Sequence, residues 1–160
     1  RLEKEQWTKP KAIANDLWKI AGCPVNGPDI TIPNNILAVV WYTAAGNTPK
    51  VQLTLSDDLG TTFKPPILLS EGNPLGRVGI TTYEGDKFLV SWLEQEKEEA
   101  IIMLALLNQK GDLLKKINLA KSSLERASGF PVITSNGSTV IAAWTSVEET
   151  KKIQTISIEF

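Results

Sequence analysis

A strand pattern that ends in tryptophan recurs three times along this chain at a nearly constant spacing. In each copy a short apolar segment leads through a polar turn into a second apolar segment that closes on a tryptophan. These residues are Trp41, Trp92 and Trp144, so the copies lie 51 and 52 residues apart. Repeats of roughly 40 to 50 residues with several strands each are typical of propeller blades. The spacing therefore predicts an all-β chain built from consecutive blades.

Each tryptophan is followed by a polar loop and a third apolar segment, and the first two copies continue into a fourth. The expected strands are residues 29–32, 36–41, 51–55 and 63–69 in the first copy, 78–83, 88–92, 100–107 and 113–119 in the second, and 132–134, 140–144 and 152–158 in the third. Residues 6–14 add an edge strand, because Pro10 has no N–H to donate to a central position. No segment longer than one turn has helical periodicity, and only residues 121–126 suit such a turn.

These strands predict a single domain over residues 1–160, made of about three four-stranded blades. Residues 1–17 are the outer strand of a preceding or partner blade, residues 18–70 and 71–120 form two blades, and residues 121–160 form a third that lacks its fourth strand. Propellers typically close with about four to eight blades, so three leave open sheet edges. Two interpretations stay open: an N-terminal propeller half is missing from this chain, or a second copy completes a six-bladed ring.

The polar turn in the first copy has the pattern Ser-x-Asp-x-Gly-x-Thr-Phe, at Ser56, Asp58, Gly60, Thr62 and Phe63. The serine hydroxyl and the aspartate carboxylate are suited to accept hydrogen bonds from turn amides. The glycine permits a positive φ, and the phenylalanine ring can fold between the two flanking strands. We expect the turn to hold one blade together and to lie far from any active site.

Together, these five residues resemble the Asp box, or bacterial neuraminidase repeat, of sialidase-like β-propellers. The resemblance implies a β-propeller of the sialidase type. An offset of 51 residues places the same positions in the second copy on Leu107, Gln109, Gly111, Leu113 and Leu114. Only the glycine matches there, so we expect one complete box and one degenerate copy.

The composition excludes several functional classes. The 17 basic residues are balanced by 18 acidic ones, for a net charge of −1, which gives no basic footprint for nucleic acid. The chain has no histidine and a single cysteine, Cys23, so histidine-based catalysis and the common metal sites are ruled out. We expect no metal and no cofactor. The longest apolar runs, residues 36–41 and 100–107, are too short to span a membrane.

Blade topology gathers a group of polar residues on one side of the disc, where first strands begin and second strands end. This side, which we call the arginine face, carries Asn26, Asn73, Arg77, Glu94 and Arg126. The two arginines are 49 residues apart, and their planar forks are suited to hold a carboxylate. The glutamate is placed to pair with Arg77. The alternative is that both arginines tie loops to neighbouring blades. The turn with Ser56 lies on the opposite side, the turn face.

Residues 21–28, 72–78, 90–94 and 126–131 resemble the C-terminal half of bacterial exo-α-sialidases. The resemblance implies a glycoside hydrolase of the periplasm or cell exterior that acts on a sialic-acid-like sugar. Such enzymes use three arginines for the sugar carboxylate, a tyrosine nucleophile assisted by a glutamate, and an aspartate as acid and base.

Arg77 and Arg126 match two of the three arginines. The sialidase Arg-Ile-Pro motif is absent, and Phe130 stands where the third blade would carry a tyrosine. The catalytic residues are therefore not assigned from the sequence. The second hypothesis is a non-catalytic propeller module for glycan or protein binding and assembly.

Overall fold

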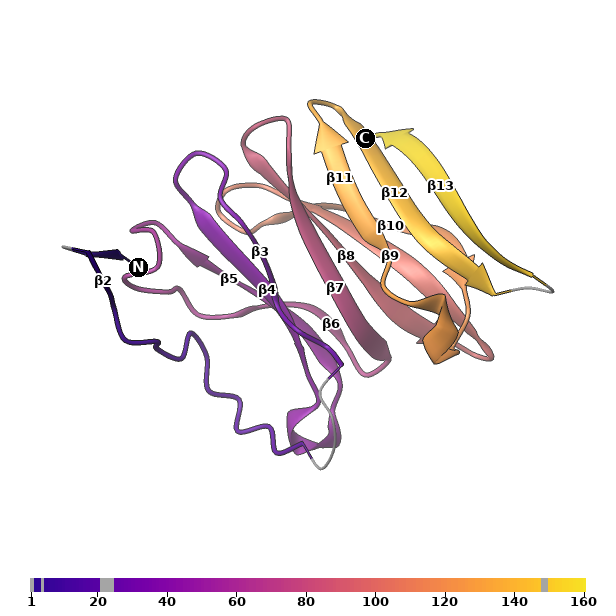
Figure 1. Ribbon diagram of the computed structural model, residues 1–160, viewed down its shortest axis with the longest axis horizontal. Coiled ribbons are helices and arrows are strands. Elements are labelled where there is room, and N and C mark those ends of the chain that lie inside the picture. The colour runs from indigo at the N-terminus through magenta and orange to yellow at the C-terminus, as the bar shows by residue number, and fades with distance from the viewer. Residues whose placement is uncertain (1, 4, 21–24, 148–149) are drawn as a thin grey trace.

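Three antiparallel sheets stand side by side in the computed structural model, which describes residues 2–3, 5–20, 25–147 and 150–160 (Figure 1). The first sheet contains β3 (Asp29–Thr31), β4 (Leu37–Thr43), β5 (Lys50–Ser56) and β6 (Ile67–Glu71) in that spatial order. The second contains β7 (Pro74–Tyr83), β8 (Lys87–Glu96), β9 (Glu99–Leu107) and β10 (Leu113–Ser122). The third contains β11 (Val132–Asn136), β12 (Thr139–Val147) and β13 (Lys151–Glu159). The predicted all-β fold of three successive blades is confirmed.

Short 3₁₀ turns mark one side of this arc. The first, η1 (Ala45–Asn47), joins β4 to β5, and the second, η2 (Arg126–Ser128), precedes β11. In Figure 1 each lies at the lower end of its own sheet, on the arginine face. Because every sheet is a simple antiparallel meander, the β5–β6 and β9–β10 turns lie at the other end of the strands, on the turn face.

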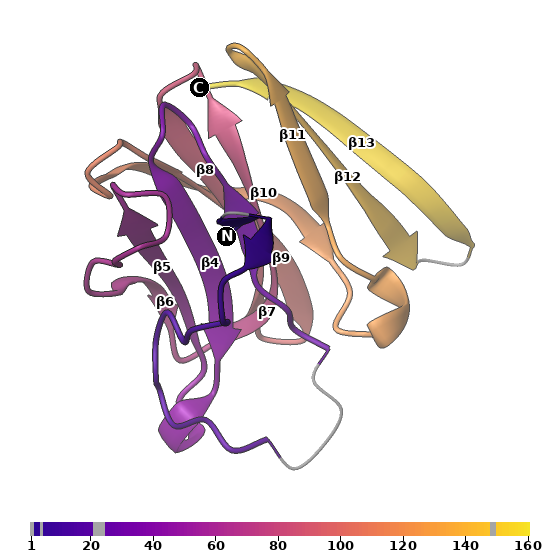
Figure 2. The same cartoon turned by 60° about the vertical axis from the view of Figure 1, so that its left-hand side comes forward.

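Two expectations from the sequence were wrong, one for a strand and one for a helical turn. Only β2 (Gln6–Trp7) of the expected strand at residues 6–14 is a strand, and it pairs with β1 (Leu2–Glu3). Residues 8–14 are not in a strand and run along the outside of the first blade (Figures 1 and 2). The expected helical turn at residues 121–126 is also shifted, because β10 continues to Ser122 through its register with β9, so the 3₁₀ turn begins only at Arg126.

The core lies between the sheets rather than within one of them. A first cluster joins β4 and β5 to the second blade through Val40, Leu53, Val90 and Trp92. A second cluster joins the second blade to the third through Leu89, Leu104, Ile133 and Val140. Strand β9 is buried from Ala100 to Leu107 because both of its faces meet a neighbouring blade. Burial of this kind removes apolar surface from water and dominates the stability of such folds.

Polar side chains join the innermost strands at intervals of about one repeat. The carboxylate of Asp29 accepts a hydrogen bond from the Ile80 amide at 2.9 Å, 51 residues further on. The hydroxyls of Thr31 and Thr82, also 51 residues apart, lie 3.1 Å from each other. Ser135 in turn donates to the carbonyl oxygen of Thr82. The sequence repeat therefore places similar polar contacts between successive blades.

Candidate functional site

The turn between β5 and β6 is held by its own side chains. Thr62 donates its amide to the Asp58 carboxylate at 2.8 Å and its hydroxyl to the same carboxylate at 2.7 Å. The Ser56 hydroxyl donates to Asp58 at 2.8 Å and accepts the Gly60 amide at 2.8 Å. Gly60 has a φ of +87°, and an added Cβ would lie 3.2 Å from Leu37 and 3.8 Å from the Phe63 ring. All five motif residues thus contribute to one compact turn. As expected, the Ser56 and Asp58 side chains accept hydrogen bonds from turn amides.

These hydrogen bonds stabilise the ionised form of Asp58. The amide and hydroxyl of Thr62 are the main reason that the pKa of Asp58 lies well below its ordinary value, and the Ser56 hydroxyl adds to the effect. The Asp58 side chain is exposed on the turn face, at the opposite end of the strands from the arginine face. Its role in the described structure is to organise the turn.

The corresponding turn of the second blade keeps a polar acceptor that the sequence comparison missed. Asn108 accepts the Asp112 amide at 3.0 Å and the Lys110 amide at 2.9 Å through its side-chain oxygen. Asn108 therefore has the same role as Asp58: each side chain accepts a hydrogen bond from the backbone amide four residues later. A comparison at an offset of 50 residues would have found it, whereas the offset of 51 places Gln109 on Asp58.

On the arginine face, Asn26 and Arg77 are brought together at a bulge in β7. Gly76 and Arg77 both have positive φ, +82° and +54°, where the register between β7 and β8 shifts. The Asn26 side chain accepts the Arg77 amide at 2.9 Å and donates to the carbonyl oxygen of Leu75 at 3.2 Å. A Cβ on Gly76 would lie 2.6 Å from that side chain, so the approach requires glycine.

The guanidinium of Arg77 then reaches the segment that leads into the third blade. It donates to the Ser128 hydroxyl at 2.5 Å, to the Gly129 carbonyl oxygen at 2.8 Å and to the Glu125 carbonyl oxygen at 3.3 Å. Partial burial lowers the pKa of Arg77, which stays protonated since arginine begins far above neutrality. Asn26, Arg77 and Ser128 are each 51 residues apart, so equivalent positions of three blades form one chain of contacts.

Arg126 lies in η2, inside the segment that Arg77 holds, and its side chain is exposed. Among the described residues, its guanidinium has neither an ion pair nor a hydrogen bond. The structure therefore separates the two arginines: Arg77 is engaged with the neighbouring blade, and Arg126 is open to solvent.

Glu94 and Asn73 lie near the same bulge, at the adjoining ends of β8 and β7. The Glu94 carboxylate accepts the indole N–H of Trp92 at 2.7 Å and the Ser70 hydroxyl at 2.9 Å. No ion pair joins it to Arg77 within the described part of the chain, so the expected pair is replaced by these two contacts. Asn73 is exposed, and its carbonyl oxygen accepts the amide of Gln95 at 2.9 Å.

Both tyrosines of the chain are engaged in packing. Tyr83 is buried and makes an edge contact with Phe160, with ring centroids 5.7 Å apart. Tyr42 is half-buried and meets Trp18 at 5.6 Å, and burial raises the pKa of the Tyr42 hydroxyl. Phe130 is exposed just before β11. Cys23, the single cysteine, lies outside the described residues.

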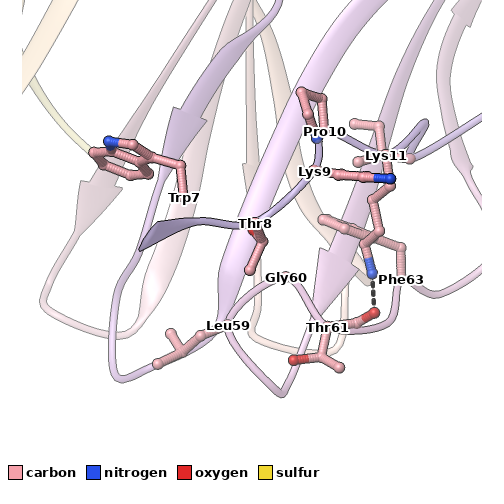
Figure 3. A pocket seen from close by; sticks show the side chains of 10 residues that line it. Trp7, Thr8, Lys9, Pro10, Lys11, Leu59, Gly60, Thr61 and Phe63 are labelled. Carbon is pink, nitrogen blue, oxygen red and sulfur yellow. Dashed lines mark hydrogen bonds between the residues drawn. The ribbon is translucent and has the colours of Figure 1, made fainter. Parts of the chain in front are cut away.

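A separate hollow of about 670 Å³ lies on the turn face, between the N-terminal segment and the β5–β6 turn. Figure 3 shows Lys11 reaching from this segment to the carbonyl oxygen of Thr61. The same amino group lies 5.7 Å from the centroid of the Phe63 ring, a cation–π contact. The sequence did not predict this hollow, since nothing in its pattern shows where the segment at residues 8–14 will lie.

Solved structures with a similar fold include the following two. A mutant of the α-L-arabinofuranosidase from Fusarium graminearum, in complex with an iminosugar inhibitor, is 12% identical, with a TM-score of 0.56 over 81% of this chain and 44% of that one. A Hadza microbial sialidase is 13% identical, with a TM-score of 0.57 over 98% of this chain and 38% of that one. The likeness shows the fold: this chain is an arc of a β-propeller.

The chain spans less than half the length of either structure. No family model matches it, and no curated protein matches it. Among the described residues, no helix has the length and apolar character needed to cross a bilayer.

Proposed function

We propose that this chain is a sialidase-type propeller segment that binds a carboxylated sugar on its arginine face. The observation that carries the proposal is the exposed guanidinium of Arg126, which has no partner among the described residues and lies on a segment that Arg77 holds in place. An arginine fork binds a carboxylate through two parallel charge-assisted hydrogen bonds. Because the carrier segment is already fixed, less freedom is lost when the ligand binds.

The neighbouring residues have supporting roles in this proposal. Arg77 positions the segment, and Asn26 positions Arg77 through its backbone amide. The Trp92 and Ser70 contacts of Glu94 both use one carboxylate oxygen, so among the described residues the other oxygen is available for a sugar hydroxyl. Asn73 offers an exposed amide beside it.

The packed tyrosines support binding rather than hydrolysis by this chain. Sialidase chemistry requires a tyrosine nucleophile that can reach the sugar, whereas Tyr42 and Tyr83 are occupied with aromatic neighbours. In this proposal the β5–β6 turn is an Asp box that stabilises its blade, and the protein works on glycans in the periplasm or outside the cell.

The binding proposal is tested with N-acetylneuraminic acid and its uncharged methyl ester, by calorimetry or by ligand-observed NMR. We expect the acid to bind and the ester to bind at least about tenfold more weakly, because only the acid offers a carboxylate to the fork. Arg126→Gln should weaken binding of the acid to a similar degree. Lys110→Gln, which removes an exposed cation on the turn face, is the matched control and should bind normally.

Equal binding of acid and ester, or unchanged binding by Arg126→Gln, would show that the arginine face does not recognise a carboxylate. A fluorogenic sialoside provides the second readout. We expect no turnover by the native chain, so measurable hydrolysis would contradict a purely binding role.

A further inference from the structure

Each outer blade has one face that no other blade covers in the described part of the chain. The free face of the first blade carries Ile30, Trp41, Gln52 and Leu68. The free face of the third blade carries Val132, Ile141, Ala143 and Ile153.

The first blade's free face is the half of a seam that receives a preceding blade. The ladder registers make Ile30, Ile80 and Ile133 equivalent, since they pair with Val39, Val90 and Ala142 in their own sheets. Ile80 and Ile133 are 7% and 8% exposed because a preceding blade covers them. Ile30 is 56% exposed. The same apolar residue type is therefore exposed in the first blade, which no preceding blade covers in the described part of the chain.

The third blade's free face is the opposite half of that seam. Ala38, Leu89 and Ile141 are equivalent by register and face the following blade. The first two are fully buried, whereas Ile141 is 44% exposed. Ile153 is 72% exposed, and its equivalent in the second blade, Ile102, is fully buried.

The two existing seams show which residues meet across such a junction. Ala38 and Ile80 belong to one buried cluster, and their equivalents Leu89 and Ile133 belong to the next. A third seam of the same kind would bring Ile141 of one chain against Ile30 of another. The first and third blades thus present complementary halves of an interface that the chain already forms twice.

The N-terminal segment has the direction of a fourth strand. Lys11 contacts Thr61 on the turn face, and Trp18 contacts Tyr42 near the arginine face, so the segment descends as β6 and β10 do. It stands away from the first sheet, leaving hollows of about 670 and 350 Å³. Strand β13 has no partner on its outer edge among the described residues. Pro10 suits only an outermost strand, where one edge needs no donors.

We propose that the occupant of both free faces is a second copy of this chain. Each third blade packs on the first blade of its partner, and each segment at residues 6–14 becomes the fourth strand beside the partner's β13. Two copies related by a two-fold axis then close a ring of six blades, within the range of about four to eight that propellers use. This assembly does not depend on sugar binding.

The test is the molar mass of the native chain in solution, measured by light scattering or sedimentation across a dilution series. We expect a species of twice the 17.5 kDa chain mass. Ile30→Lys and Ile141→Glu should each raise the dissociation constant by at least about tenfold, because each places a charge in an apolar seam. Leu113→Lys is the matched control: it is 55% exposed, on the second blade, and should leave the mass unchanged.

The double variant Ile30→Lys with Ile141→Glu places opposite charges across the same seam and should recover part of the dimer. Circular dichroism and thermal unfolding check that every variant is folded, which we expect since both residues are already exposed. A native chain that stays monomeric at all concentrations would overturn the proposal. A dimer that is insensitive to both single variants, or equally sensitive to Leu113→Lys, would overturn the assigned faces.

Discussion

Arg77 adopts a left-handed backbone conformation that arginine rarely takes, with a φ of +54°. Such conformations persist only where the surroundings impose them. Here Asn26 fixes the Arg77 amide from the first blade, and Ser128 and Gly129 fix its guanidinium from the third. One residue therefore holds three blades in register at the arginine face, while Arg126 is exposed to solvent. Backbone strain at Arg77 is thus connected to the place where the proposed ligand binds.

Asp58 carries a pH-dependent share of the stability. Its pKa is lowered in the folded chain, so the stabilisation is complete above the ordinary carboxyl value of 3.8 and is lost progressively as the pH falls below it. We expect Asp58→Asn to lower the thermal unfolding temperature by several degrees at pH 7. The difference from the native chain should shrink as both are measured in increasingly acidic buffer.

Asp57→Asn is the control for this prediction, since within the described part of the chain Asp57 makes a single, exposed ion pair, with Lys64 at 2.7 Å. It should change the unfolding temperature little at either pH. Equal losses in the two variants, or a constant deficit of Asp58→Asn across the pH range, would show that the hydrogen bonds of the turn do not depend on ionisation.

At the scale of elements, the blades and their turns follow from local chemistry, and the contacts between blades do not. Alternation, turn residues and the tryptophan repeat predict most of the strands of the three sheets, because each depends on neighbours in sequence. The bulge at Gly76 and the contacts of Arg77 depend on groups brought in from other blades. A repeat-length comparison of polar residues would have linked Asn26, Arg77 and Ser128, but their roles come only from their geometry.

The N-terminal segment also shows that local sequence does not predict long-range contacts. Its residues 6–14 have the composition of an edge strand, yet a strand forms only where a neighbouring edge is available to pair with it. Among the described residues, β2 alone finds one, in β1. The local sequence therefore predicts that residues 6–14 can form a strand, but only Gln6–Trp7 does so in this structure.

Gly111 allows a direct test of how the β9–β10 turn packs against the first blade. Its φ is +89°, and an added Cβ would clash with the Ile67 side chain. Gly111→Ala therefore combines backbone strain with a steric clash. Gly137→Ala, at a φ of +64° with open space around it, adds only the strain. We expect Gly137→Ala to cost about 1 kcal/mol of unfolding free energy and Gly111→Ala clearly more, measured by denaturant unfolding. Equal losses would mean that the turn does not rest on Ile67.

At the scale of the whole molecule, the central blade is the most protected part of the described chain. Strands β8 and β9 are covered on both faces, whereas β13 is exposed along one face and one edge. Backbone amides exchange with solvent most slowly where the structure is most buried and fully paired. The arc therefore has a stable centre and two ends that differ in the faces they present.

Amide hydrogen exchange at several protein concentrations connects this gradient to assembly. We expect the amides of β8 to be protected at every concentration. Amides of β13 that point to its outer edge should exchange quickly in dilute protein and slowly once the dimer forms. Protection of β13 that does not vary with concentration, in a chain whose mass does vary, would place the second copy elsewhere.

The near-constant interval between contacting groups has a consequence for how such a chain changes over evolutionary time. Asp29 reaches Ile80, Thr31 reaches Thr82, and Asn26 reaches Arg77, each across 51 residues. A duplicated segment of that length would therefore bring its own matching groups to both of its neighbours. Such a duplication would add one whole blade, and the contacts of Asn26, Arg77 and Ser128 show that equivalent positions need not carry the same side chain to meet across a junction.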